Sequence, residues 1–374
     1  MYPSWGTAKP PSIRGVGRLL TIAFAVAVAV FVAGCGGGGE KHAVACAPKP
    51  LTHYVIYRAR GRDGAAVTPT TLDATVKALC DRARAAGATG VAVRRIGAGQ
   101  IEIGGPKPPS GSLGAPARLA FYDWEPNLLP AAQSRPTVSL FKAVQIASRQ
   151  KPRAEAVDLP SDRANDATGR KYYVFGPDRK PLGSAPNAAD AFYASCPEIA
   201  AAFHGPGTCG ASRGSTVVEV PRGIVVLKDE SRPPQQAGIG YWILEDDAEL
   251  TGADITNPKQ SFDPQTSEPI VSFGFTPKGR AAFARVTKRE AVRGQNIKRS
   301  PGRAPQDTFQ RFAMALDGHL VSLATVSYID NPDGIDGSTG AQINGLGDIT
   351  TTRDLAVNLS TGPLPLDLAL VSSR

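Results

Sequence analysis

The sequence predicts an α+β fold, and three observations support this prediction. Two Thr-Pro pairs, at 68–69 and 276–277, provide the capping residue and the first-turn proline with which helices begin, and each follows a predicted strand. Asp317-Gly318 lies between two strand-like runs, which is the strongest short signal for a β-hairpin. Helices interspersed with single strands and strand pairs are typical of a layered α+β body.

Residues 1–35 are predicted to be a lipoprotein signal peptide. Basic residues precede an apolar run at 19–33, whose roughly 22 Å of helix is too short for the roughly 30 Å hydrocarbon core. The run ends in Val-Ala-Gly-Cys, which resembles a bacterial lipobox with Cys35 as the lipidated residue. Residues 36–50 start with four glycines and form a predicted flexible tether. An ordinary signal peptide with a chance cysteine is the alternative.

The first part of the folded body is predicted at 51–125. A strand at 53–58 precedes the helix that starts at Thr68-Pro69, and Gly87 suits the left-handed cap at the end of that helix. Strands follow at 91–95, 100–103 and 119–124. This order predicts a helix between strands.

Residues 126–239 are proline-rich and are predicted to be an insertion. Helical patterns lie at 138–148 and 188–203. The clear β signal is a hairpin of 216–220 and 224–228 around Pro221-Arg222-Gly223.

Residues 240–374 are predicted to be the second part of the domain. Strands are expected at 241–244, 269–275, 311–316, 319–326 and 364–371. One helix runs from 277 to about 290, and another starts with a capping box of Thr351 and Asp354 and stops before Gly362-Pro363. Together with 269–275, this order is β-α-β-β-α-β, which predicts a ferredoxin-like base with a discontinuous inserted region, completed by the first half.

The cysteines agree with an exported protein. Four of the five remain after Cys35, and four cysteines allow three pairings in an oxidising compartment. Proximity favours Cys196 with Cys209 and, more weakly, Cys46 with Cys80, at about 2–4 kcal/mol each. Buried free thiols are the alternative.

Composition narrows the possible functions. At 42% hydrophobic and 20% charged residues, the 374-residue chain is globular. The net charge of +9 suits an anionic membrane surface, and basic residues are not interleaved with aromatic ones as nucleic-acid binding requires. No second apolar run approaches eighteen residues, so no transmembrane segment is expected in the mature protein.

Several segments resemble the first extracytoplasmic domain of SecD, an accessory subunit of the bacterial protein-export machinery. They lie at 250–255 (Leu-Thr-Gly-Ala-Asp-Ile), 270–275, 313–322, 342–345 and 355–365, with Phe283 and Thr287 between them. A weaker likeness covers 71–106, including Asp81-Arg82-Ala83-Arg84 and Gly87. The resemblance implies contact with unfolded polypeptide leaving the Sec translocon. It also implies transmembrane helices that couple proton flow to transport, which no segment here matches, so we expect no proton-coupled motor.

No motif predicts catalysis, a metal or a cofactor. Gly205–Gly210 matches G-x-G-x-x-G and Ser212 lies in G-x-S-x-G, but neither has the strand-then-helix context that these motifs need. The acidic run at 330–336 lacks the spacing of a calcium loop and is interpreted as turns. Glu245-Asp246-Asp247 is interpreted as a solvated strand end.

The sequence therefore predicts a non-enzymatic accessory of protein export, lipid-anchored on the extracytoplasmic side of the cell membrane. It would bind translocating polypeptide through an exposed sheet edge or an apolar groove, and it would contact the Sec translocon. The alternative is a lipid-anchored binding or scaffold module whose partner is unrelated to export. An enzyme with a site assembled only in three dimensions, for example around Ser212, is the least favoured hypothesis.

Overall fold

The structure is a computed structural model of the 374-residue chain. It describes residues 46, 52–61, 66–107, 111–129, 138–151, 171–185, 188, 191, 214–230, 240–298 and 304–373. The predicted signal peptide with Cys35, the tether except for Cys46, the cysteines at 196 and 209, and Ser212 lie outside these residues.

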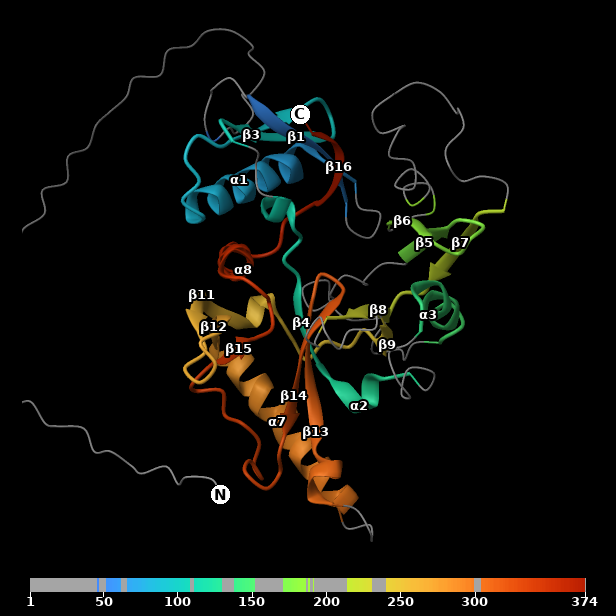
Figure 1. Ribbon diagram of the computed structural model, residues 1–374, viewed down its shortest axis with the longest axis vertical. Coiled ribbons are helices and arrows are strands. Elements are labelled where there is room, and N and C mark those ends of the chain that lie inside the picture. Colours follow the sequence, from blue (N-terminus) through green and yellow to red (C-terminus); the bar gives the residue numbers. More distant parts are fainter. Residues whose placement is uncertain are drawn as a thin grey trace, which may run out of the picture. The chain divides into compact units, whose positions relative to one another are not determined.

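The described residues form a mixed α+β fold in which sheets predominate (Figure 1). The first sheet has four antiparallel strands in the order β16-β1-β3-β2. Its elements are β1 (His53–Arg60), β2 (Ala92–Ile96), β3 (Gln100–Gly105), β16 (Asp367–Ser373) and the helix α1 (Pro69–Ala85). The buried stripe of α1, with Leu72, Val76 and Leu79, forms one core with Ile101 and Ile103 of β3.

Helix α1 begins and ends as its sequence indicates. Thr68 and Thr71 form a capping box, Pro69 is the first helical residue, and Gly87 has a φ of +68° just beyond the C-cap. Both ends of the helix are therefore set by residues within or next to it, independently of its packing against the sheet.

The second sheet has six strands in the order β10-β4-β13-β14-β8-β9, with β14 and β8 parallel and the other pairs antiparallel. The strands are β4 (Leu119–Asp123), β8 (Ile224–Asp229), β9 (Tyr241–Glu245), β10 (Leu250–Thr251), β13 (Gln310–Leu316) and β14 (His319–Val326). Successive residues of β13 face opposite cores, Phe312 one and Ala313 the other, because side chains alternate along a strand.

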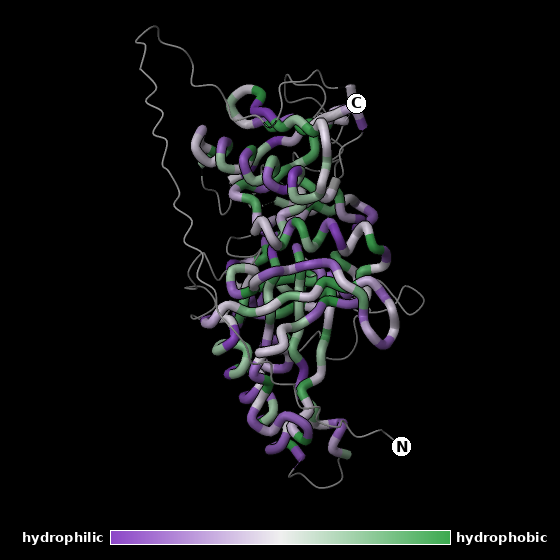
Figure 2. Tube along the Cα trace, turned by 90° about the vertical axis from the view of Figure 1, so that its left-hand side faces the viewer, coloured by the Kyte–Doolittle hydropathy of each residue, from purple (hydrophilic) through white to green (hydrophobic). Residues whose placement is uncertain are grey.

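Helices cover both faces of this sheet. On one face α7 (Pro277–Lys298) contributes Phe283 and Val286 to the core, and on the other α3 (Leu140–Ala147) contributes Ala143 and Val144. The short helix α2 (Trp124–Asn127) continues directly from β4. Hydrophobic and hydrophilic residues alternate along the helices, as expected for elements with one buried face (Figure 2).

Two three-stranded antiparallel sheets complete the described fold. One has the order β11-β12-β15 and the other the order β6-β5-β7. Their strands are β11 (Ile255–Phe262), β12 (Pro269–Phe275), β15 (Ala341–Ile343), β5 (Lys171–Phe175), β6 (Pro181–Ala185) and β7 (Thr216–Val220). Helix α8 (Ile349–Thr361) contacts α1, β11 and β12, and its Leu355 and Leu359 are buried in the core that α7 also lines.

Two glycines allow α7 to lie very close to neighbouring backbone. A Cβ at Gly279 would be 2.1 Å from the carbonyl oxygen of Asp254, and one at Gly294 would be 2.8 Å from that of Thr308. Both distances are far below van der Waals contact, so this packing requires glycine at both positions.

The prediction that 269–371 forms its own β-α-β-β-α-β unit is wrong. Strand β12 lies in one sheet, β13 and β14 in a second, and β16 in a third. The four-stranded sheet instead combines β1, β2 and β3 with β16 from the far end of the chain, because β16 pairs with β1 over six residue pairs. The six predicted elements occur in the predicted order, with β15 as an additional strand before α8, but their pairing partners are distant in sequence.

Three smaller predictions are also corrected. Strands β7 and β8 do not form a hairpin, since β7 pairs with β5 whereas β8 pairs with β9 and β14. Helix α7 continues to Lys298 rather than ending near 290. The N-cap of α8 is Asp348, which accepts hydrogen bonds from the amides of Thr350 and Thr351, so Thr351 is not the cap.

The boundary predicted at 239 falls between β8 and β9, two paired strands of the six-stranded sheet. That sheet therefore draws strands from the predicted insertion as well as from both flanking parts. Among the described residues, no helix is both long and apolar enough to cross a membrane.

Candidate functional site

Two chain segments connect the four-stranded sheet to the rest of the described fold, and one arginine binds both of them. The segment after β3 passes through 106–118, and the segment after α8 passes through 362–366. Arg82 of α1 is fully buried between them. We call the arrangement of Arg82 with its four acceptors the Arg82 clasp.

The guanidinium group of Arg82 donates four hydrogen bonds in the clasp. Nη1 donates to the carbonyl oxygens of Leu113 at 2.9 Å and Ala115 at 2.5 Å. Nη2 donates to the carbonyl oxygen of Gly362 at 2.8 Å, and Nε donates to Oγ1 of Thr361 at 3.2 Å. One side chain thus holds α1 to both connections, which the planar fork of arginine allows.

The Arg82 side chain remains charged at neutral pH. Burial lowers the pKa of Arg82 to about 10, and the Asp317 carboxylate opposes this shift. Asp317 is the first residue of the predicted Asp-Gly turn, with a φ of +50°, and its carboxylate accepts hydrogen bonds from the amides of Ala117 and Arg118. The turn between β13 and β14 therefore also fixes the segment that enters β4.

Helix α8 is tied to the same connection. Oγ of Ser112 donates to Asp354 at 2.6 Å, and Nδ2 of Asn358 donates to the carbonyl oxygen of Ser112 at 2.9 Å. Ser112 lies in the short 3₁₀ helix η2 (Gly111–Gly114). Contacts from α1, α8 and the β13–β14 turn thus converge on 112–118.

A second polar cluster lies where α7 crosses the end of β4. Arg293 binds Asp123 through two nitrogens, at 2.5 and 3.1 Å, and donates to Oε1 of Gln310 at 2.5 Å. Arg289 binds Asp123 at 3.3 Å and also pairs with Glu249. Because Asp123 is only 3% exposed, these pairs lie at the packed interface between α7 and β4.

The same cluster contains Glu125, which accepts from the backbone amide and the Nε of Arg311 at 3.0 and 2.9 Å. It also contains Glu290 of α7, which is fully buried. We call this set the α7 charge cluster. Its members are Asp123, Glu125, Glu249, Arg289, Glu290, Arg293, Gln310 and Arg311.

The described sheet edges differ in how they are protected. Strand β11 contains Pro258 and Lys259, and a register shift interrupts its pairing with β12; these three features discourage pairing with another chain. Strand β7 pairs regularly with β5 over five residues, has neither proline nor lysine, and exposes 47% of Val217. Within the described residues β7 has no partner on its other side.

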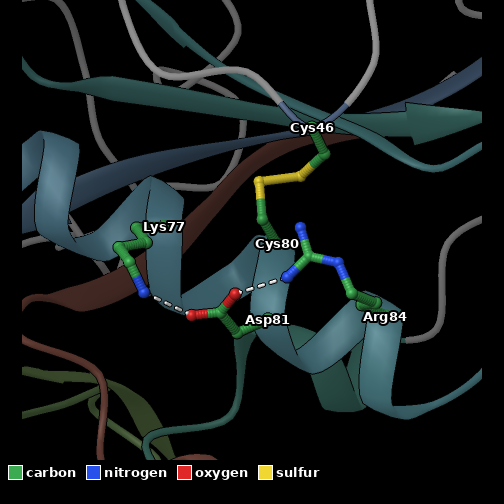
Figure 3. The surroundings of a disulfide bond; sticks show 5 residues. All are labelled: Cys46, Lys77, Cys80, Asp81 and Arg84. Carbon is green, nitrogen blue, oxygen red and sulfur yellow. Dashed lines mark hydrogen bonds and ion pairs between the residues drawn. A yellow bond between two sulfur atoms is a disulfide. The ribbon is translucent and has the colours of Figure 1, made fainter. Parts of the chain in front are cut away.

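A disulfide joins Cys46 to Cys80 of α1, with a Cα–Cα distance of 5.5 Å (Figure 3). This is the second of the two predicted pairings, the one that the longer sequence separation made the weaker prediction. On the next residue of α1, Asp81 pairs with Lys77 at 2.8 Å and with Arg84 at 2.7 Å. Hydrogen bonds from these two cations lower the pKa of Asp81. The pairing of Cys196 with Cys209 lies outside the described residues.

Of the two acidic segments, 245–247 and 330–336, the first differs from the prediction in its burial. Glu245 and Asp246 are 8% and 2% exposed, so the interpretation of a solvated strand end is wrong for these two residues. Asp246 accepts a hydrogen bond from the buried Tyr122 hydroxyl at 2.6 Å. In the later run, Asp333 pairs with Lys288 and Asp336 with Arg280. In the described ranges, no three His, Cys, Asp or Glu side chains are grouped so that they could hold a metal ion.

Sequence analysis did not identify the acceptors of Arg82 or the α7 charge cluster. One signal was available for Glu290. It lies seven residues after Phe283 and three after Thr287, on the same face of α7, so a charged residue interrupts a buried stripe. Asp123 gives no such signal, because its partners are more than 160 residues away in sequence.

A family model described as SecDF, P1 head subdomain, matches residues 226–366. The protein translocase subunit SecD of Rickettsia prowazekii is 30% identical over 161 residues, covering 41% of this chain and 25% of that protein. SecD of Acetobacter pasteurianus is 32% identical over 129 residues, covering 34% of this chain and 20% of that protein. The chain therefore spans a quarter or less of the length of these relatives.

Two solved SecDF structures align with this chain at low similarity. The crystal structure of SecDF in the super-membrane-facing form aligns with a TM-score of 0.42 and 18% identity, over 86% of this chain and 30% of that one. A structure of SecDF, described as a membrane component that enhances protein export, aligns with a TM-score of 0.40 and 17% identity, over 86% of this chain and 99% of that one. From the sequence matches, residues 226–366 are similar to the P1 head subdomain of SecDF, and the chain resembles the first extracytoplasmic domain of SecD.

Proposed function

We propose that this chain is a lipid-anchored, non-enzymatic accessory of protein export that binds translocating polypeptide on the outer face of the membrane, without a proton-coupled motor of its own. The observation that carries the proposal is the match of residues 226–366 to the SecDF P1 head subdomain. Sequence matches to SecD subunits of the protein translocase support it. The Sec translocon is the expected neighbour at the membrane.

The proposal assigns a part to each region. Cys35 carries the lipid, and residues after it form the tether. The four-stranded sheet, with strands in the order β16-β1-β3-β2 and helix α1, is the proposed ferredoxin-like base. Residues 226–366 correspond to the head.

Strand β7 is the proposed contact for extended polypeptide. Strand addition uses backbone hydrogen bonds, so it accepts many sequences, as a general export accessory requires. An edge with an exposed Val217 and without proline or lysine is suited to this mode.

The proposal is tested by depleting the protein and following secretion of reporter preproteins. In parallel, a photo-crosslinking amino acid is placed at position 217 on β7 and, as the matched control, at position 262 on the protected strand β11. Both native side chains are about equally exposed, Val217 at 47% and Phe262 at 53%. We expect slower export on depletion and crosslinks to arrested preproteins from 217 but not from 262. Normal export together with no crosslink from 217 would refute the proposal.

The anchor is tested separately with Cys35→Ser. We expect the variant to leave the membrane fraction and to lose incorporation of labelled fatty acid. A variant that remains membrane-bound with unchanged processing would show that Cys35 is not the anchor.

A lipid-anchored scaffold with a partner unrelated to export is the second candidate. It is favoured by the sheet of β5, β6 and β7, which lies before residue 226 and thus outside the family match. The crosslinking experiment separates the two candidates, because a scaffold predicts one recurring folded partner at 217 and unchanged secretion.

A further inference from the structure

The α7 charge cluster contains one more acid than base. Among its described members, the guanidinium groups of Arg289, Arg293 and Arg311 are matched by the carboxylates of Asp123, Glu125 and Glu249. Glu290 is the fourth carboxyl group. The cluster is electrically neutral only while Glu290 holds a proton, and an unpaired charge on the fully buried side chain of Glu290 is strongly disfavoured.

Glu290 has no fixed partner. Its side chain is fully buried, and neither oxygen of its carboxyl group has a hydrogen-bond partner within the part of the chain that the structure describes. Every other carboxylate of the cluster is paired with an arginine. Glu290 is therefore the group whose state of protonation can change without first breaking a contact.

Arg293 is the base placed to bind an ionised Glu290, because its charge opposes the raised pKa of Glu290 more strongly than that of Arg289. Residues three apart on a helix are neighbours, so the side chains of Glu290 and Arg293 share one face of α7. Arg293 is at present bound to Asp123 through two hydrogen bonds of 2.5 and 3.1 Å. Arg289 is occupied by Asp123 and Glu249.

The titratable and charged groups around Glu290 come from each element packed against α7 in this region. They are Asp123 and Glu125 at the end of β4, Glu249 before β10, Arg311 of β13, Tyr328 beside Gly294, and Arg289 and Arg293 of α7 itself.

We propose that Glu290 is a proton-operated latch between α7 and β4. With its proton, Glu290 is neutral and leaves Arg293 bound to Asp123, so α7 stays fixed to the end of β4. When the proton passes to solvent, the Glu290 carboxylate takes Arg293 from Asp123. One of the two arginine contacts between α7 and Asp123 is then replaced by a contact within α7, so that Asp123 retains only Arg289 and the attachment of α7 to β4 is weakened.

The direction of the pKa shift of Glu290 agrees with this latch. The pKa of Glu290 is raised to about 9, mainly by burial and additionally by the carboxylates of Asp123 and Glu125, against the opposing effect of Arg293 and Arg289. The latch is therefore closed at neutral and acidic pH and opens on the alkaline side.

The chain contains its own reporter for this change. Trp124 follows Asp123 directly and is fully buried, and its ring lies 5.1 Å from that of Trp242 in an edge-to-face contact. The only other tryptophan is Trp5. In a Trp5→Phe background, the tryptophan fluorescence of the full chain, excited selectively at the red edge of the absorption band, comes from this pair alone.

The test is to titrate tryptophan emission of the full chain from pH 6 to 9.5. We expect a reversible change with a midpoint well above 7, which Glu290→Gln abolishes and the exposed control Glu268→Gln retains. Asp123→Asn removes one of the neighbouring carboxylates that favour the proton and frees Arg293, so it should lower the midpoint by at least one pH unit.

The Asp123→Asn titration remains decisive if Glu290→Gln does not fold. An emission that is constant over this pH range in the parent chain would overturn the proposal. So would a midpoint that is the same in the parent, Glu290→Gln and Asp123→Asn chains.

Discussion

The Arg82 clasp predicts that one arginine of α1 contributes far more to stability than its neighbour two residues away. Arg82→Met keeps the aliphatic stem but removes four hydrogen bonds, to Leu113, Ala115, Thr361 and Gly362. Bonds from a charged donor contribute about 1.5–3 kcal/mol each, so the lower figure gives a loss of about 6 kcal/mol.

Relief of the buried charge offsets part of that loss. The fall in the pKa of Arg82 from 12.5 to about 10 corresponds to about 3.4 kcal/mol of disfavoured charge, at 1.36 kcal/mol per unit. The expected net decrease in the free energy of unfolding is therefore about 3 kcal/mol. Arg82→Lys should lose nearly as much, because one ammonium group cannot reach acceptors on both connecting segments.

Arg84→Met is the matched control. Arg84 lies on the same helix, its side chain is 73% exposed, and its described ion pair is with Asp81 on the helix surface. Exposed pairs of this kind contribute about 0.3–0.5 kcal/mol. Urea denaturation followed by circular dichroism gives both values, and limited proteolysis should cut Arg82→Met faster within 106–118. A difference of less than 1 kcal/mol between the two variants would contradict the assigned role of the clasp.

Three further predictions follow from single contacts. Cys80→Ser opens a loop of 34 residues and should lower the free energy of unfolding by about 3–4 kcal/mol, and dithiothreitol should destabilise the parent chain by about that much more than it destabilises the variant. Gly279→Ala places a methyl group against the carbonyl oxygen of Asp254 and should lower the free energy of unfolding by about 1–3 kcal/mol, measured as a lower thermal midpoint. The control Ala281→Gly, at a solvent-exposed position of the same helix, should lower the free energy of unfolding by no more than about 1 kcal/mol. Because the pKa of Glu290 is raised from 4.5 to about 9 in the folded state, its stabilising contribution is complete below pH 4.5 and is lost as the pH rises to about 9. Between pH 6 and 8 the parent chain should therefore lose about 2–3 kcal/mol relative to Glu290→Gln in urea denaturation, and parallel pH profiles for the two chains would refute this assignment.

Local sequence signals, such as capping residues and turn dipeptides, predict the positions of most helices and strands in the described residues. The capping box at Thr68, the start of α7 after Thr276 and the turn at Asp317-Gly318 appear in the structure where the sequence predicted them. Each depends on residues at most a few positions apart, so the physical cause lies within the segment itself. Local signals do not predict β5, β6, β10, β11 and β15. Strands β10 and β15 have only two and three residues, and β6 and β11 contain proline, whereas β5 has neither feature.

Pairing between distant segments was the main error. The hairpin expected around Pro221-Arg222-Gly223 has a turn, but the strands on either side join different sheets. Strand β8 finds a parallel partner in β14 and an antiparallel one in β9, and the pattern of apolar residues in β8 is compatible with either kind of neighbour. A sequence pattern predicts the presence of a strand more reliably than it predicts the neighbouring strand in the sheet.

The sequence by itself determined the α+β class, the positions of the main helices and the resemblance to SecD, because these depend on local composition and on ordered motifs. Only the tertiary structure decided that β16 closes the sheet begun by β1, that Arg82 binds both connections to that sheet, and that the buried Glu290 is the unmatched acid of the α7 charge cluster. The physical reason is that each of these features depends on burial or on partners far away in the chain. No periodicity or motif encodes which remote carbonyl or carboxylate a buried charge will meet.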